Sequence, residues 1–269
     1  MTEVFLGIDA GTSAIKVCAF DKQGALLKKV QRFVPVITPY PLWVEIDLER
    51  YWELLLEALQ EVTAQTGPVS SLGLSTTCPT TILLDSERKP VRHAMVYLDG
   101  RADAIVRSVV GQDTVTFQRL SGNRASTSTC WAANLMWVQE NEPEVWKNVR
   151  SVCMLNSYIA MRMTGELAID PTQASYSGLM DVKQAEPQWH PDLMRLWKTP
   201  AEYLPPIVHG AQHLAQAEAA LDWALPAEVL ARPIAEATAA LLAAITGGGK
   251  LMVCGSGAGA ALAPHMARL

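Results

Sequence analysis

The chain has 269 residues, of which 49% are hydrophobic, so it contains enough apolar material for one large domain or two of moderate size. Charged residues make up 18% of the sequence and the formal net charge is −5. This balance argues against a surface that neutralises nucleic-acid phosphates or anionic lipid headgroups. We therefore expect neither a nucleic-acid partner nor a membrane partner.

The cysteines and the N-terminus indicate the compartment. The five cysteines are scattered and form no CxxC pair, so neither a disulfide framework nor a zinc site is indicated. The N-terminus lacks the basic region and the uninterrupted apolar stretch of a secretory signal. No segment offers the roughly 18 consecutive apolar residues that span a membrane. These patterns favour a soluble protein in the reducing cytoplasm.

The N-terminal part of the chain predicts strands followed by a helix. The first thirty residues alternate short apolar runs with turns, which predicts a three-stranded meander whose second reversal uses Gly24. Apolar residues then recur at three- and four-residue spacing over 48–62, with Asp47 as the N-cap of an amphipathic helix. The apolar runs 70–75 and 80–85 predict two further strands.

The α/β alternation continues along the chain. We expect a strand, loop and helix over 94–110, a helix that stops near Pro143, and a strand and helix that end at Gly165. Beyond a proline-punctuated region the composition becomes alanine-rich. We therefore predict a first domain over residues 1–206 and a helical, alanine-rich remnant over residues 207–269.

A short motif near the N-terminus can bind phosphate. Asp9 ends an apolar strand and is followed by a tight turn that contains Gly11, Thr12 and Ser13. Backbone N–H groups and hydroxyls in such a turn can hold a polyphosphate, the carboxylate can hold a hydrated Mg²⁺, and Lys16 can add positive charge. On spacing alone, an ordinary hairpin with an aspartate at its edge is an equally good interpretation.

Residues 5–27 resemble the first phosphate motif of the actin-like ATPase superfamily, and specifically that of the FGGY family of carbohydrate kinases. Further segments resemble this family in order and spacing, over residues 4 to about 207: 41–59, 72–85, 96–104, 121–123, 135–146, 158–166, 170–175 and 203–207. The resemblance implies an α/β, actin-like (ribonuclease H-like) domain with a mixed sheet flanked by helices. It also implies a phosphotransferase that moves the γ-phosphate of ATP, with Mg²⁺, to a hydroxyl of a sugar or polyol.

The resemblance also implies a role for each matching residue. Asp9 is the metal-binding and phosphate-binding aspartate, and Gly11, Thr12 and Ser13 form the phosphate turn. The loop that faces the sugar contains Thr76, Thr77, Cys78 and Thr80. Xylulokinases have a Met-His pair in this loop and glycerol kinases an Arg-Glu pair, whereas this chain has Cys78 and Pro79. The identity of the sugar or polyol is therefore open.

Tyr97, Asp99 and Arg101 match the Trp-Asn-Asp-x-Arg stretch of the family. An aromatic ring can pack on the C–H face of a sugar while a charged pair orients its hydroxyls. The alternative is an ion pair that only fixes the loop. Asp170 likewise matches a family position near the substrate, but a role as the N-cap of a helix that begins at Pro171 is an equally good interpretation.

The aspartate that accepts the proton of the attacking hydroxyl in this family is not found. Beyond Pro206 the one aspartate is Asp222, which has no flanking glycines. Gly255, Gly257 and Ala258 instead resemble the adenosine-binding turn of the family. Two alternatives to a self-sufficient kinase follow. The first is an inactive sugar-binding or regulatory remnant. The second is a chain that works with another polypeptide or as a homodimer, since apolar surface that a missing half would otherwise bury should drive association.

Overall fold

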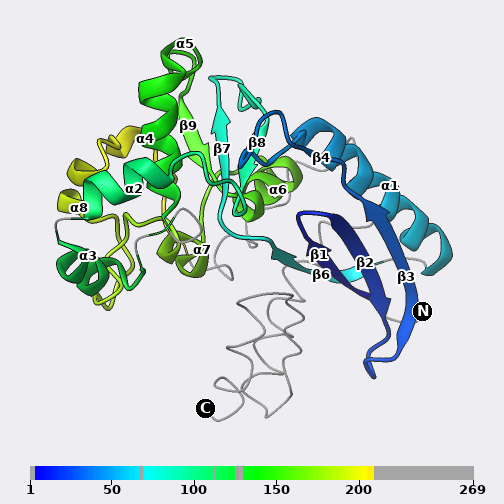
Figure 1. Ribbon diagram of the computed structural model, residues 1–269. Helices are drawn as coiled ribbons and strands as arrows, with labels where there is room; N and C mark the ends of the chain where they lie inside the picture. Colours follow the sequence, from blue (N-terminus) through cyan, green and yellow to red (C-terminus); the bar gives the residue numbers. More distant parts are fainter. Residues whose placement is uncertain (1–3, 67–68, 112, 125, 127–129, 209–269) are drawn as a thin grey trace.

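The computed structural model describes residues 4–66, 69–111, 113–124, 126 and 130–208 (Figure 1). The sequence-predicted residues Asp222, Gly255, Gly257 and Ala258 lie outside the described residues. The boundary near Pro206 and the remnant over 207–269 therefore stay predictions. None of the helices in the described part is long and apolar enough to cross a membrane.

A four-stranded mixed sheet forms the N-terminal side of the molecule. It contains β1 (Val4–Ala10), β2 (Ala14–Phe20), β3 (Leu26–Phe33) and β6 (Val69–Thr76), in the order β3-β2-β1-β6. β1 pairs antiparallel with β2 and parallel with β6, while β2 pairs antiparallel with β3. The predicted meander is thus confirmed, and Gly24 adopts a positive φ of 80° at its second reversal.

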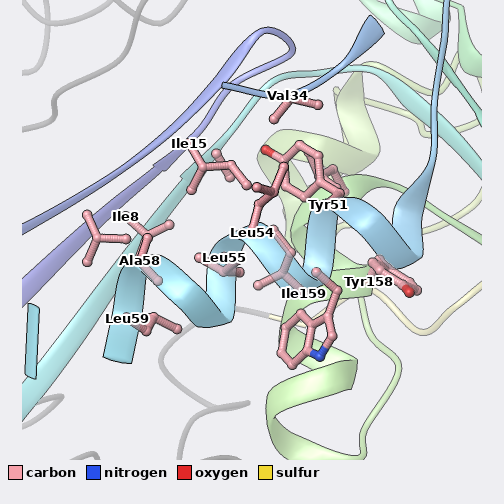
Figure 2. Packing of buried hydrophobic residues seen from close by; sticks show 14 of the residues in the cluster. Ile8, Ile15, Val34, Tyr51, Leu54, Leu55, Ala58, Leu59, Tyr158 and Ile159 are labelled. Atoms are coloured by element: carbon pink, nitrogen blue, oxygen red, sulfur yellow. The ribbon is translucent and has the colours of Figure 1, made fainter. Parts of the chain in front are cut away.

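The helix α1 (Leu48–Thr66) packs on this sheet (Figures 1 and 2). Its apolar side chains recur at helical spacing, so one face is buried against the strands. The Asp47 Oδ1 atom accepts hydrogen bonds from the backbone N–H groups of Glu49 and Arg50, at 3.0 and 3.2 Å. This confirms Asp47 as the N-cap, and the cap fixes where the helix begins.

A second sheet contains the predicted strands at 80–85 and near residues 94 and 151, together with two short strands that the sequence does not indicate. Its five strands lie in the order β4-β5-β8-β7-β9, and all of their pairings are antiparallel. The strands are β4 (Val36–Ile37), β5 (Glu45–Ile46), β7 (Thr80–Leu84), β8 (Ala94–Val96) and β9 (Ser151–Cys153). β4 and β5 have two residues each, which is too short for an alternating pattern to be visible in the sequence.

The remaining helices surround the second sheet. Two predicted ends are confirmed: α4 ends just before Pro143, and α6 ends at Gly165, whose φ is 78°. The helices are α2 (Asp103–Val110), α3 (Thr114–Ser121), α4 (Trp131–Asn141), α5 (Pro143–Trp146), α6 (Leu155–Thr164), α7 (Pro171–Ser175) and α8 (Pro191–Leu196), followed by the 3-10 turn η2 (Ala201–Tyr203).

The described residues bury two hydrophobic clusters with β7 between them. Every residue of β7 is buried, and successive side chains point to opposite faces of a strand. Ile82 and Leu84 accordingly belong to the cluster formed with the first sheet, α1 and α6. Leu83 belongs to the cluster formed with α2 and α4, which includes Trp131 and Trp197. The two faces of β7 thus pack into different hydrophobic clusters.

Candidate functional site

The candidate site lies where the carboxyl ends of β1 and β6 meet. These strands are parallel, and their register pairs Asp9 with Ser75 and Ala10 with Thr76. The segments that follow them therefore leave the sheet at the same edge. The backbone N–H of Thr77 donates to the carbonyl oxygen of Ala10 at 3.0 Å, which holds the two segments together.

The turn that follows β1 is tight. The N–H of Gly11 donates to the carbonyl oxygen of Ala14 at 3.0 Å. A Cβ atom at Gly11 would lie 2.9 Å from that same oxygen, which is closer than such atoms approach, so the turn requires glycine. The Thr12 Oγ1 atom donates to Thr77 Oγ1 at 3.1 Å, and Ser13 is exposed. The turn thus has hydroxyls and backbone donors at one sheet edge.

Asp9 and Lys16 are opposite one another on β1 and β2, and their side chains form an ion pair. Lys16 Nζ lies 2.8 Å from Asp9 Oδ2, and the two side chains remain 34% and 25% exposed. A pair of this exposure contributes little stability, so it is no obstacle to a ligand that competes for the carboxylate. The lysine instead holds the carboxylate at the edge where the turn begins.

The Asp9 carboxylate suits one type of magnesium site, in which the protein supplies few of the ligands. Within the described residues no group of three or more His, Cys, Asp or Glu side chains is placed to enclose a metal. Mg²⁺ is commonly held by one or two carboxylates together with waters and substrate phosphates, so the partly exposed Asp9 beside the phosphate turn suits it. Such a site would be shared, because phosphate would complete the set of ligands around the metal.

The loop between β6 and β7 brings some of the expected residues together and hides one. Thr77 is bonded to the phosphate turn, as described above. Thr80 has no exposed surface, so the expectation that it contacts a sugar is not supported: it begins a buried strand. The Oγ1 atoms of both Thr76 and Thr80 are buried, without a hydrogen-bond partner in the described part of the chain. Such hydroxyls are uncommon and costly.

Cys78 lies in the same loop, next to a thioether and a carboxylate. Its Sγ atom is 3.7 Å from Met154 Sδ. Burial raises the pKa of the Cys78 thiol, and the negative charge of Asp170 raises it further. The thiol is therefore neutral at physiological pH and unsuited to act as a nucleophile.

Asp170 caps a helix, as one of the two interpretations predicted. Its Oδ1 atom accepts from the backbone N–H of Gln173 at 3.0 Å, and Pro171 begins α7. Its Oδ2 atom accepts from the Asn156 side chain. The capped end of α7 is near the thiol of Cys78, since the charge of Asp170 acts on that thiol.

Tyr97, Asp99 and Arg101 do not form one exposed surface. The Tyr97 side chain is partly exposed, whereas the side chains of Asp99 and Arg101 are fully buried. Asp99 accepts hydrogen bonds from Arg101 at 2.6 and 2.8 Å and from the backbone N–H of Val44 at 2.7 Å. The expectation that Asp99 and Arg101 orient sugar hydroxyls directly is corrected, and the alternative, an ion pair that fixes the loop, agrees with the structure.

The guanidinium of Arg101 is enclosed on all sides. It lies 3.9 Å from the ring centre of Trp43 and 5.1 Å from that of Trp137, and it donates to Glu45 at 2.6 Å. Burial lowers the pKa of Arg101, but its hydrogen bonds to Asp99 and Glu45 outweigh this effect and raise it overall. The charge is thus retained inside the protein as a structural group.

A groove in the described part lies elsewhere. It has a volume of about 1040 Å³, and none of the sequence-predicted site residues lines it. Arg92 pairs there with Glu45 and Glu142, and Arg162 pairs with Glu49. The charges of Arg92 and Arg162 in this groove are thus balanced by neighbouring carboxylates.

One residue of the site was missed by sequence reasoning. The Tyr51 hydroxyl donates to the carbonyl oxygen of Gly11 at 2.9 Å, so α1 contacts the phosphate turn directly. The periodicity of the apolar residues over 48–62 predicted only that Tyr51 lies on the apolar face of the helix. The available signal was its residue type, because a buried tyrosine hydroxyl usually needs a hydrogen-bond partner.

The fold and the turn together define the class of the protein. A mixed sheet flanked by helices, with a phosphate-type turn after its first strand, is the actin-like (ribonuclease H-like) ATPase fold. Solved structures share it: the gluconate kinase from Lactobacillus acidophilus aligns with a TM-score of 0.74 and 22% identity, over 78% of this chain and 43% of that one. The xylulose kinase from the same organism gives a TM-score of 0.73 and 23% identity, over 78% and 42% of the two chains.

The sequence itself shows the family. Residues 4–236 match the family model described as "FGGY family of carbohydrate kinases, N-terminal domain", so the chain belongs to this family. The xylulose kinase of Escherichia coli (strain K12) is 28% identical over 214 residues, which cover 78% of this chain and 43% of the relative. The glycerol kinase of Gloeobacter violaceus is 28% identical over 265 residues, which cover 97% and 52%. The chain thus spans about half the length of these curated relatives.

Proposed function

We propose that the described residues form the sugar-binding lobe, with its phosphate turn, of an ATP-dependent carbohydrate kinase. The observation that supports this best is the contact between the proposed phosphate-binding segment and the proposed sugar-binding segment. The turn after β1 and the loop after β6 are joined by the Thr12–Thr77 hydrogen bond of 3.1 Å. A nucleotide phosphate at the turn and a hydroxyl at the loop would then be neighbours, as phosphoryl transfer requires.

On the phosphate side, the proposal assigns distinct roles to the residues of the turn. The backbone N–H groups of Thr12 and Ser13 would bind phosphate oxygens, and their hydroxyls would add further hydrogen bonds. Asp9 would hold Mg²⁺, which when bound neutralises phosphate charge. Lys16 would keep the Asp9 carboxylate at the turn, through the ion pair of 2.8 Å.

On the sugar side, the proposal rests on Tyr97, Thr76 and Thr77. The partly exposed ring of Tyr97 would pack on the C–H face of a sugar or polyol. The unpartnered hydroxyl of Thr76 is buried, so it would reach a substrate hydroxyl only if the loop after β6 moved. Cys78 adds little polarity here, since a neutral thiol is a weak donor and acceptor. We propose a small sugar or polyol as substrate, and the scattered cysteines support a cytoplasmic setting.

The test is the variant D9N, with D21N as its matched control. Asp21 lies at the far end of β2, in an exposed turn where its Oδ1 accepts from the N–H groups of Gln23 and Ala25. The chain and both variants are titrated calorimetrically with Mg-ATP and then with pentuloses, hexuloses and polyols, alongside an assay of ADP release. We expect D9N to weaken Mg-ATP binding by about tenfold or more and to leave sugar binding unchanged. Equal Mg-ATP affinity in all three proteins would refute the phosphate site.

A second candidate function follows from the acidic residues of the sequence. Asp222, the one aspartate of residues 207–269, has no flanking glycines, so the second candidate for these 269 residues taken alone is sugar binding or regulation without chemistry. That chain would bind sugar and release no ADP. If a second copy or another polypeptide supplies the base, ADP release would instead rise more steeply than linearly with chain concentration. The same assay, run over a range of concentrations, separates these cases.

A further inference from the structure

We propose that Tyr51 is a positioning residue that holds the phosphate turn in its binding conformation through the hydroxyl it places on the Gly11 carbonyl. This inference rests on the proposed function and adds to it that a side chain of α1 orients the phosphate turn. The hydrogen bond has a length of 2.9 Å and links two residues that are 40 positions apart in the sequence.

The position of Tyr51 is fixed from its own helix. It stands in the first turn of α1, where its N–H donates to the carbonyl oxygen of Asp47 at 2.9 Å. Its side chain is buried, with the whole residue 1% exposed. Figure 2 shows the ring between α1 and the sheet, close to Ile15 and Val34. Ile15 follows the turn on β2, and the N–H of Val34 donates to the carbonyl oxygen of Ser13 in the turn at 3.0 Å. The Tyr51 ring therefore lies beside two residues that are directly connected to the turn.

The hydroxyl acts on the turn through the geometry of one peptide group. The carbonyl of Gly11 and the N–H of Thr12 belong to the same planar trans peptide and point in opposite directions. Holding the carbonyl oxygen on Tyr51 therefore turns the Thr12 N–H away from α1. An N–H that faces away from the interior is available to a phosphate oxygen.

The tyrosine remains a donor across the physiological pH range. Burial raises the pKa of the Tyr51 hydroxyl, and the negative charge of Asp9 raises it further. The proton that bonds the Gly11 carbonyl therefore stays on Tyr51. Asp9 and Tyr51 thus serve the same turn with different chemistry, since one contributes charge and the other a fixed donor.

The experiment compares Y51F with Y158F in the full chain. Tyr158 is equally buried. Its hydroxyl accepts a hydrogen bond from Arg162 at 2.7 Å and donates one to Glu49 at 3.3 Å, away from the turn. Both variants delete one buried hydroxyl and keep the ring. Two measurements are made: amide hydrogen exchange of the segment 10–14 without ligand, and calorimetric affinity for Mg-ATP and for a bound sugar or polyol.

We expect Y51F to speed exchange in the segment 10–14 and to raise the dissociation constant of Mg-ATP about tenfold, while sugar affinity stays unchanged. Y158F should alter neither the exchange nor the nucleotide affinity. The inference is overturned if Y51F leaves exchange in that segment unchanged, or if Y158F reproduces its effects. If the unmodified chain binds no Mg-ATP, the proposed function fails on its own, while the exchange data still decide whether Tyr51 holds the turn.

Discussion

Two glycines, Gly11 and Gly24, each lie in a turn between strands, but each turn requires glycine for a different reason. Gly11 is needed because a Cβ atom would lie 2.9 Å from the Ala14 carbonyl oxygen, a backbone atom that moves only if the turn opens. Gly24 is needed for its φ of 80°, and nothing lies within 4 Å of the place where its Cβ would stand. Both positions resist substitution, but for different physical reasons.

We therefore expect G11A and G24A to differ in ligand binding rather than in stability. Each should lower the free energy of unfolding by about 1–2 kcal/mol, since alanine at positive φ and a crowded Cβ both cost energy. Only G11A should weaken Mg-ATP binding, by about tenfold or more, because only that turn would open. Urea unfolding and calorimetric titration measure the two effects. Equal nucleotide affinity in G11A and G24A would contradict the assignment of the turn.

At the residue scale, sequence reasoning identified positions better than orientations. Asp9 lies near the end of a strand and Gly11 and Thr12 lie in the turn that follows, as the sequence predicted, because this motif is local. The burial of Thr80 and of Asp99 was not found, because exposure depends on neighbours that are distant in the sequence. For Asp99 these include Val44, whose N–H is 55 positions away.

At the scale of elements, buried charge joins two segments that have almost no regular structure. Asp99 and Arg101 follow the three-residue strand β8, and Glu45 begins the two-residue strand β5. Arg101 donates to both carboxylates, at 2.6 Å in each case, inside a cage that includes the Trp43 ring. These ionic hydrogen bonds and the ring contact hold the Tyr97 loop where strand pairing is too short to do so.

Removing the guanidinium should be costly for this reason. We expect R101M to lower the free energy of unfolding by about 3–5 kcal/mol, since it leaves the Asp99 carboxylate buried without its cation, whereas Glu45 keeps its pair with Arg92. The control is R50M, because Arg50 pairs with Glu53 and Glu57 on an exposed face of α1 and should change stability little. Urea unfolding compares the two variants. Similar losses in both would mean that the buried network contributes no more than a surface pair.

The elements that sequence predicted well are those with a repeating pattern and an end signal. α1 has both, in its apolar spacing and its Asp47 cap, and α6 ends at Gly165 as expected. Three strands of the second sheet, β7, β8 and β9, were predicted, but β4 and β5 were missed because they are set by pairing across the chain. Val36 opposes Ile46 in that pairing, and no local pattern announces it.

At the scale of the whole molecule, the two cores are joined by strands of the second sheet, and β7 contributes residues to both. Ile82 and Leu84 pack into the first cluster and Leu83 into the second, on opposite faces of β7. A strand that is fully buried on both faces cannot leave one core without exposing the other. The candidate site depends on this arrangement, since the loop with Thr77 and Cys78 leads directly into β7.

We therefore expect the described lobe to unfold as one cooperative unit. I82A and L83A should each cost about 2–5 kcal/mol, the usual range for truncating a buried aliphatic side chain, although they open cavities in different cores. V115A is the control, because Val115 is 75% exposed. Amide hydrogen exchange in urea, followed in α1 and in α4 separately, should show both helices losing protection together in either variant. If I82A released α1 while α4 stayed protected, the cores would be independent, and the sugar loop could lose order without the phosphate turn.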